Sequence, residues 1–401
     1  MVGKRFIDVQ MNESNPKWNK SITRINNIYK RTGDMRSQFE RDYNRILHCT
    51  AYRRLKNKTQ VFSAPHNDHI CTRIEHVNHV TSVSYTIAKY LGLNTELTNA
   101  IAIGHDLGHA PFGHSGEDFL KKITKRELGE TFWHEKNSLR VVDKVETLED
   151  REGVMQNLNL TYAVRDGIVS HCGEVNENAV FPRNEYIDLN IIEKPNEYQP
   201  YTWEGCIVKI ADKISYLGRD IQDAVRLNIL TKRQLSEFKK ILNVKLIDIN
   251  NAILMHDFIS NLCQNSSPEA GICFSKKHLQ LINQVKEFNY KYIYFHPRLV
   301  SYDHYAELII NSIFDILKEC YSKDIFKSIK KHEKYHPLLT SSFIFWLQKY
   351  SNKRGNKADI FGNVILYNIE NEKDYYMAII DYIASMTDLF AIDIFNELTS
   401  F

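Results

Sequence analysis

Apolar residues recur every three or four positions along much of this 401-residue chain, which has only 9 prolines and 16 glycines. This spacing puts them on one face of an amphipathic helix, so the pattern predicts a mainly helical protein. It is clearest at 75–91, 97–107 and about 204–229, and further helices are expected at 302–320 and 375–396. An Asn94/Thr95 cap should begin the second helix, and Pro111 and Gly113 should stop it just beyond His105 and Asp106.

No internal repeat and no low-complexity linker divides the chain. We therefore expect a single all-α unit over 1–401, with a helical core at about 60–230 and a C-terminal helical elaboration at about 231–401. The polar stretch 172–201 predicts a loop or a short β-hairpin over the site, and 267–271 and 352–357 carry turn signals.

Composition excludes several other classes of protein. The chain has no run of about 18 uncharged apolar residues, so a transmembrane span is not expected. Its N-terminal residues lack the apolar centre of a signal peptide, and its seven cysteines are scattered without a CxxC pair. These features favour a cytoplasmic protein with reduced thiols. The net charge of +3 is too small to indicate nucleic-acid binding by itself.

One set of side chains carries metal chemistry: His76, His105, Asp106 and Asp212. Two imidazoles and two carboxylates suit a divalent ion such as Mn²⁺, Mg²⁺, Fe²⁺, Co²⁺, Ni²⁺ or Zn²⁺. All four fall on predicted helices, so a bundle core can aim them at one point and leave positions open for water and a substrate oxygen. Each residue taken alone is more often a surface or hydrogen-bonded group, so the surrounding pattern has to decide.

That pattern resembles the HD phosphohydrolase superfamily, and most closely its deoxynucleoside triphosphate triphosphohydrolases of the dGTPase type. The resemblance rests on ordered blocks: 39-FERDYNRILHCTAYRRLKNKTQVF-62, 71-CTRIEHVNHV-80, 104-GHDLGHAPFGHSGE-117, 131-TFWHEKNS-138, 167-GIVSHCGE-174, 207-IVKIADKISYLGRDIQDA-224 and 381-DYIASMTDLFA-391. It implies an all-helical HD core and a reaction that releases a deoxynucleoside and intact triphosphate. By position, His76, His105, Asp106 and Asp212 resemble the metal ligands.

The resemblance also implies catalytic residues. His114 matches the histidine beside the ester oxygen that leaves the α-phosphorus, and an imidazole suits proton donation there because its pKa is near neutrality. Glu117, three residues on, can hold that ring if the chain is helical there. His134 and Glu135 resemble the second His/Glu pair of the family, which supports His114 or an activated water.

Substrate contacts follow in the same way. Arg73 and Lys213 match phosphate-binding positions, and His109 is expected to line the phosphate channel. Gln60, Tyr216 and Asp220 match residues around the deoxyribose, where a tyrosine ring against C2′ would exclude a 2′-hydroxyl. Ordinary alternatives exist for these residues, since lone Arg and Lys side chains are usually solvated and tyrosines are often core residues.

The sequence also suggests several partners. The family implies a dNTP substrate, a homo-oligomer (tetramer or hexamer) and an activating dNTP at an allosteric site. The basic cluster 53–58 can touch phosphates, a second nucleotide or DNA, although the aromatic residues of a single-strand groove are sparse there. The family's tail motif usually has a basic residue where this chain has Leu389. Two alternatives remain: an HD phosphohydrolase acting on nucleoside monophosphates or signalling nucleotides, and a nucleotide sensor without turnover.

Overall fold

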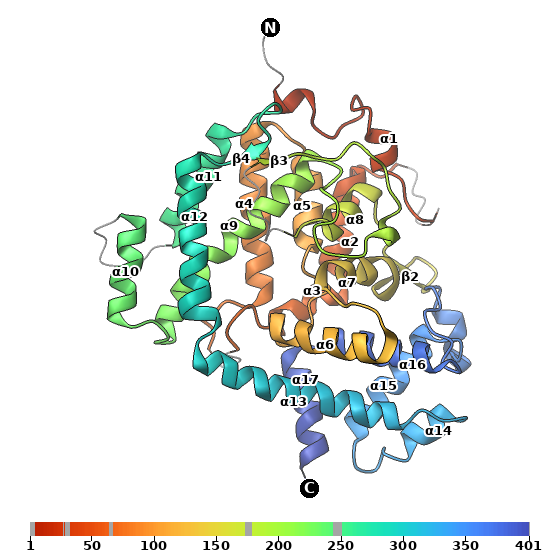
Figure 1. Ribbon diagram of the computed structural model, residues 1–401. Coiled ribbons are helices and arrows are strands. Elements are labelled where there is room, and N and C mark those ends of the chain that lie inside the picture. Colours follow the sequence, from red (N-terminus) through yellow and green to blue (C-terminus); the bar gives the residue numbers. More distant parts are fainter. Residues whose placement is uncertain are drawn as a thin grey trace.

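The computed structural model describes residues 5–26, 28, 33–63, 67–172, 179–243 and 251–400. Within these ranges the chain forms seventeen α-helices and two small two-stranded sheets, so the prediction of an all-α fold is confirmed. Figure 1 shows two layers, with the N-terminal half above α6 and the last helices below it. No helix in the described part of the chain is both long and apolar enough to cross a bilayer.

Five helices build the layer that carries most of the sequence blocks, and α5 packs against each of the other four. They are α2 (Gln38–His48), α4 (Arg73–Leu91), α5 (Thr95–Gly104), α8 (Tyr162–Val169) and α9 (Trp203–Arg226). The predicted helices at 75–91 and 204–229 correspond closely to α4 and α9. Burial of Val77, Val80, Val83 and Ile87 on α4 confirms that its apolar stripe faces the core.

Local capping explains where the central helices begin. Thr72 and Glu75 form a capping box at the start of α4, and Gly92 ends that helix in the left-handed conformation with φ 77°. Asn94 caps α5 as predicted, because its side chain accepts hydrogen bonds from the backbone N–H groups of Glu96 and Leu97.

The predicted end of this second helix is wrong. α5 ends at Gly104, so His105 occupies the C-cap and Asp106 lies in the turn that follows, rather than both lying on a helix. Contacts with α7 (His134–Arg140) hold this turn: Gly108 N–H donates to Ser138 Oγ at 2.9 Å, and Gly108 C=O accepts from Asn137 Nδ2 at 2.7 Å. These long-range bonds replace the hydrogen bonds that would have continued the helix. Gly113, expected as a stop, instead begins α6 (Gly113–Leu128).

The second layer joins α6 to the C-terminal helices. In it, α13 (Pro297–Glu319) and α16 (Glu372–Ala384) both pack against α6, and α17 (Asp388–Thr399) packs against α13. The predicted helix 302–320 therefore begins earlier, at Pro297. The predicted segment 375–396 is two helices, since the chain breaks at 385–387 and Thr387 caps α17.

Seven shorter or peripheral helices complete the fold. They are α1 (Trp18–Ser21), α3 (Thr50–Arg54), α10 (Lys232–Leu242), α11 (Asn251–Asn265), α12 (Lys276–Asn289), α14 (Ile325–Lys330) and α15 (Pro337–Tyr350). Buried apolar side chains form two clusters. One is drawn from residues 6–293. The other is drawn from α6 and residues 306–394, with Ala110, Phe112, Phe132 and Val145 added from the chain on either side of α6. The predicted elaboration at 231–401 thus contributes to both clusters, and its boundary at about 230 stays a prediction.

The strands lie in unexpected places. A β-hairpin joins β1 (Thr147–Glu149) to β2 (Met155–Asn157). Within 172–201, β3 (Ala179–Val180) pairs with the distant β4 (Ile272–Cys273), so this region forms no hairpin of its own in the part that is described; residues 173–178 lie outside it. The Ser267–Gly271 turn confirms the signal at 267–271. All seven cysteines are free thiols, as predicted.

Candidate active site

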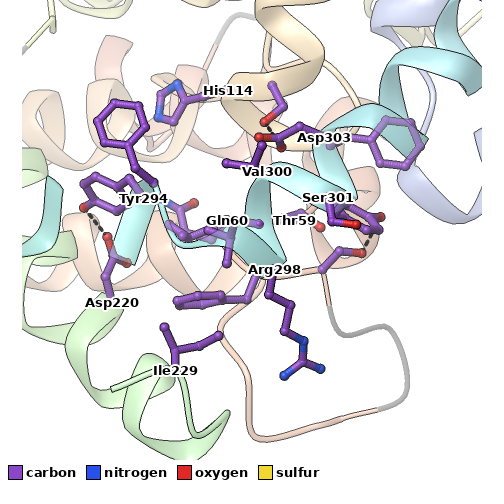
Figure 2. Close-up of a pocket in the computed structure, with 18 of the residues that line it drawn as sticks. Thr59, Gln60, His114, Asp220, Ile229, Tyr294, Arg298, Val300, Ser301 and Asp303 are labelled. Carbon is purple, nitrogen blue, oxygen red and sulfur yellow. Dashed lines mark hydrogen bonds between the residues drawn. The ribbon is translucent and has the colours of Figure 1, made fainter. Parts of the chain in front are cut away.

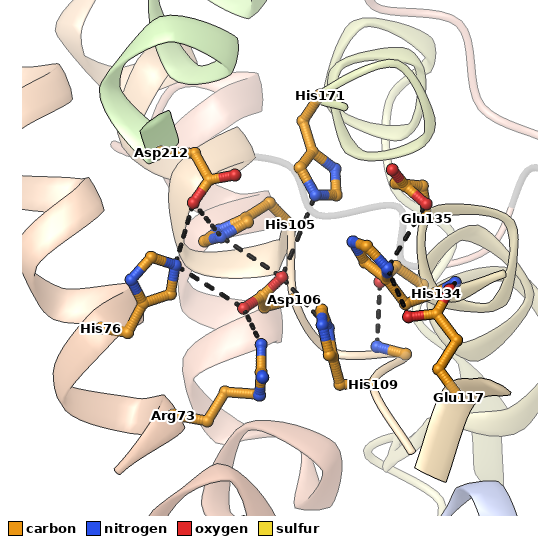
Figure 3. Close-up of polar contacts among 12 residues, drawn as sticks. Arg73, His76, His105, Asp106, His109, Glu117, His134, Glu135, His171 and Asp212 are labelled. Carbon is orange, nitrogen blue, oxygen red and sulfur yellow. Dashed lines mark hydrogen bonds and ion pairs between the residues drawn. The ribbon is translucent and has the colours of Figure 1, made fainter. Parts of the chain in front are cut away.

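The four predicted metal ligands meet where α4, α9 and the end of α5 converge (Figure 3). His76 Nε2 lies 2.9 Å from Asp212 Oδ1. His105 Nε2 lies 3.4 Å from Asp106 Oδ1 and 3.8 Å from Asp212 Oδ1. Residues from three separate segments therefore present their donor atoms to one small volume.

These side chains fit a divalent cation. His105 Nδ1 is 2.7 Å from the carbonyl oxygen of Ala102, which fixes the proton on Nδ1 and leaves the Nε2 lone pair facing the site. That Nε2 is buried and has no hydrogen-bond partner in the described part of the chain. Burial lowers the pKa of His105 to about 4, so the ring is neutral at physiological pH. One donor atom each of His76, His105 and Asp212 lies within 4.8 Å of the other two.

Arg73 holds the other side of Asp106. At the start of α4 it is 1% exposed, and its Nη1 donates to Asp106 Oδ2 at 2.6 Å. Burial disfavours charge on Asp106, but His109, His105 and Arg73 outweigh it and hold the pKa of this carboxyl well below its usual range. Asp106 is therefore an anion whose Oδ2 faces Arg73 and His76 and whose Oδ1 faces His105 and His109.

A second cluster of ionisable side chains lies around the start of α6. His114 Nδ1 is 3.7 Å from Glu117 Oε2, which confirms that local helix brings the two together, and the His114 side chain is 65% exposed. Glu117 lies closer to His134, accepting from its backbone N–H at 2.8 Å and lying 2.9 Å from its Nδ1. Burial lowers the pKa of His134, but the carboxylates of Glu135 and Glu117 outweigh it and raise the pKa to about 10. His134 is thus a cation held between two carboxylates.

Two further histidines connect these groups. His109 Nδ1 is 3.2 Å from Asp106 Oδ1, and its ring lies against that of His134 with 3.9 Å between centroids. His171 has no predicted role, although it lies in the block 167–174. It is buried, with Nδ1 2.6 Å from the Ile168 carbonyl oxygen and Nε2 3.9 Å from Asp106 Oδ1. Its presence in a family block was the signal that could have identified it.

Two cavities adjoin at this place. The smaller cavity, of about 260 Å³, is lined by Arg73, His76 and Asp106 and by the second ionisable cluster, which is His114, Glu117, His134 and Glu135. The larger, of about 1000 Å³, runs beside α13 and is lined mainly by aromatic and apolar side chains (Figure 2). Four residues line both: Gln60, His114, Asp118 and Tyr216. A ligand with an anionic end and a flat apolar end can occupy both cavities at once.

Tyr216 and Asp220 lie one and two turns beyond Asp212 on α9, and both face the larger cavity. The Tyr294 hydroxyl donates to Asp220 Oδ2 at 2.6 Å (Figure 2). Burial raises the pKa of Asp220 to about 7. Nothing in the sequence around Tyr294 pointed to this contact. Lys213 is buried beside Asp212 and is not among the residues that line either of these two cavities.

Two glycines allow the backbone to pack this tightly. A Cβ on Gly108 would lie 2.1 Å from Ser138 N, and one on Gly116 would lie 1.8 Å from the Pro111 carbonyl oxygen. Between them Phe112 adopts the left-handed conformation with φ 65°, which is uncommon for a residue with a side chain. The turn that carries His109 and the helix that carries His114 therefore depend on close backbone contacts.

The basic cluster 53–58 is partly used inside the fold. Arg54 donates to Glu146 at 2.7 Å, and the Lys58 ammonium donates to backbone carbonyls while only 2% exposed. Arg53 and Lys56 are exposed and are the cations of the cluster that an anionic partner would reach first.

Comparison with known proteins identifies the family of this chain. The HD domain family matches residues 73–217, a range that begins at Arg73 and includes all four predicted ligands. A deoxyguanosinetriphosphate triphosphohydrolase-like protein of Caldanaerobacter subterraneus is 34% identical over 281 residues, covering 70% of this chain and 72% of its own. One from Rickettsia bellii is 31% identical over 398 residues, covering 91% of this chain and 92% of its own. One from Clostridium tetani is 29% identical over 401 residues, covering 98% of this chain and 95% of its own.

The chain belongs to the deoxyguanosinetriphosphate triphosphohydrolase-like family of HD-domain proteins. The resemblance seen in the sequence is thereby confirmed. Members of this HD-domain family are metal-dependent phosphohydrolases, and the His/Asp cluster of this chain can hold the divalent ion that such a hydrolase needs.

Proposed function

We propose that this chain hydrolyses deoxynucleoside triphosphates to the deoxynucleoside and inorganic triphosphate, with water attacking the α-phosphorus. The observation that carries the proposal is the junction of the two cavities at Tyr216 and His114. A nucleotide bound there would have its α-phosphate among the charged residues and its nucleoside in the larger, more apolar cavity. The names of the relatives support the same substrate class.

The proposed metal ligands are His76, His105, Asp106 and Asp212. When bound, a divalent ion acts as a Lewis acid and offsets negative charge on the reacting phosphate. The mixed N/O donor set suits Mn²⁺ and also Mg²⁺, Fe²⁺, Co²⁺, Ni²⁺ or Zn²⁺.

Protein side chains supply phosphate binding and proton transfer. Arg73 and His109 line the smaller cavity and are the proposed phosphate contacts, and the buried Lys213, next to Asp212 in the sequence, adds positive charge near them. His114 lines both cavities, which supports its proposed role as the group that donates a proton to O5′ as the bond between that oxygen and the α-phosphorus breaks. Glu117, His134 and Glu135 line the same cavity as His114. Their charged side chains hold protons next to His114 and orient the attacking water.

Sugar recognition follows from the residues at the junction. Gln60 Oε1 is buried and has no hydrogen-bond partner among the described residues, so it can accept a bond from the substrate. Asp220, which lines the larger cavity, can bond the 3′-hydroxyl. Tyr216 stands between both cavities, where its ring would contact C2′ and exclude a 2′-hydroxyl.

A product assay tests the proposal. Purified protein is incubated with Mn²⁺ and each of the four dNTPs, with and without a second dNTP as activator, and the products are separated by anion exchange. Release of deoxynucleoside and triphosphate is expected, and Asp212→Ala should abolish it. Release of pyrophosphate or monophosphate, or turnover only of monophosphates or signalling nucleotides, would contradict the proposal. Nucleotide binding without turnover under every metal and activator would identify a sensor.

Four further expectations rest on the family resemblance or on sequence composition. A homo-oligomer (tetramer or hexamer), an activating dNTP at an allosteric site, nucleic-acid binding and a cytoplasmic location stay predictions. Size-exclusion chromatography with light scattering, in the presence and absence of dNTP, measures the first of them directly.

A further inference from the structure

The carboxylate of Asp388 connects the C-terminal tail block 381–391 to two residues that line the larger cavity, Thr59 and Phe112. Asp388, the first residue of α17, is 5% exposed. Its Oδ2 accepts a hydrogen bond from Thr59 N–H, and its Oδ1 accepts one from Phe112 N–H, both at 2.9 Å. One side chain thus joins two loops that are more than fifty residues apart in the sequence.

Lys58 makes a parallel connection. Its ammonium is 2% exposed and donates to the carbonyl of Ala384, at the end of α16, at 2.9 Å. It also donates to the carbonyl of His109. The tail is therefore bonded twice to the segment at 58–59 and once to the turn at 109–112, and Lys58 bonds that same turn through His109.

Both loops lead directly to reacting groups. The carbonyls of Thr59 and Gln60 accept from the Arg73 guanidinium at 3.3 Å each, and Arg73 in turn donates to Asp106. On the other side, Phe112 is the N-cap of α6, two residues before His114. Its left-handed backbone is intrinsically unfavourable and persists only when its surroundings hold it.

We propose that Asp388, assisted by Lys58, is a positioning residue that aligns the His114 turn with the loop that holds Arg73. The inference rests on the proposed function, because it concerns the geometry of that same site. Asp388 touches neither predicted metal ligands nor either cavity, so it acts through Phe112 and Thr59 rather than on the substrate.

Asp388→Asn tests the idea with almost no change of shape. The amide nitrogen of asparagine cannot accept a hydrogen bond, so one of the two backbone N–H groups loses its partner. We expect kcat for dNTP hydrolysis to fall about ten- to a hundredfold, because small displacements of an acid from its substrate are costly. KM should change less than threefold. Faster hydrogen exchange of the Thr59 and Phe112 amides would show directly that the two bonds are weakened.

Matched variants separate positioning from general loss of stability. Thr387→Ala removes the side-chain cap of α17 and leaves the Asp388 carboxylate in place, and Asp393→Asn alters an exposed carboxylate on the same helix. Both should keep kcat within twofold. If Asp388→Asn fails to fold, Lys58→Met takes its place, because it removes the bonds to His109 and Ala384 with little loss of apolar volume.

A double-mutant cycle with His114→Ala gives the decisive outcome. If Asp388 acts by aligning His114, its substitution should cost less than threefold in the His114→Ala background. An equal loss in both backgrounds, or an unchanged kcat in Asp388→Asn or its substitute, overturns the inference. Failure of the proposed function looks different, because wild type itself would then release no triphosphate.

Discussion

Arg73 Nη1 lies 2.6 Å from Asp106 Oδ2, the same oxygen that lies 3.8 Å from His76 Nε2. A predicted phosphate-binding arginine thus holds a predicted metal ligand. Substrate binding and metal binding are connected through the Asp106 carboxylate, because a movement of the Arg73 guanidinium toward a phosphate would change its contact with that carboxylate.

Arg73→Lys should therefore impair substrate binding although charge is kept. A lysine is a point charge and cannot bond Asp106 and the backbone carbonyls of Thr59 and Gln60 in one plane. We expect KM for dNTP to rise about tenfold or more and kcat to fall, as measured by steady-state kinetics. Arg53→Lys, at an exposed position, is the control and should match wild type. An unchanged KM would remove Arg73 from the phosphate site.

Glu117→Gln should slow the reaction and leave affinity nearly unchanged. The substitution removes the negative charge that holds the protonated His134, and it weakens the contact with His114. The expected effect is a fall of about ten- to a hundredfold in kcat with KM within threefold, the range typical of a lost acid–base contribution. Glu127→Gln on the same helix should have no such effect, because Glu127 binds Lys318 and Arg126 at a distance from the cavity. Equal rates for the Glu117→Gln and Glu127→Gln variants would refute the acid–base role of Glu117.

Tyr216→Ala should relax sugar selection. Loss of the ring would open space at C2′, so hydrolysis of ribonucleoside triphosphates should rise relative to that of dNTPs by about tenfold or more. The measurement is the ratio of kcat/KM for dGTP and GTP. Tyr335→Ala, at an exposed tyrosine, should keep the wild-type ratio. A Tyr216→Ala enzyme with unchanged selectivity would show that the tyrosine is only a packing residue.

Asp220 should make stability depend on pH in a defined direction. Burial raises its pKa to about 7 in the folded chain, whereas an exposed aspartate titrates near pH 4. The folded state therefore binds the proton more tightly, so this contribution to stability is complete below about pH 4 and is lost as pH rises through about 7. The loss is at most about 4 kcal/mol.

Thermal unfolding between pH 5 and 8 measures this effect. Wild type should lose several degrees of Tm relative to Asp220→Asn over that range, because asparagine does not titrate. Asp315→Asn, at an exposed carboxylate on α13, should follow wild type. Parallel curves for wild type and Asp220→Asn would show that Asp220 stays ionised in the folded protein.

Much of the scaffold followed from local sequence. α4 and α9 were predicted closely because their apolar residues recur every three or four positions, a pattern that local sequence carries by itself. The metal-ligand set was predicted from a resemblance carried by short ordered blocks. The end of α5 was not, because hydrogen bonds between Gly108 and α7 decide it, and these join residues about thirty positions apart.

The sequence by itself therefore determined the helical class, the main helices and the family to which the chain belongs. Only the tertiary structure brought His171 to Asp106, Tyr294 to Asp220 and Asp388 to the two loops beside the cavities. Periodicity and capping report which face of a helix is buried, but they do not report which distant polar group meets that face. Those pairings depend on how the two helical layers are packed together.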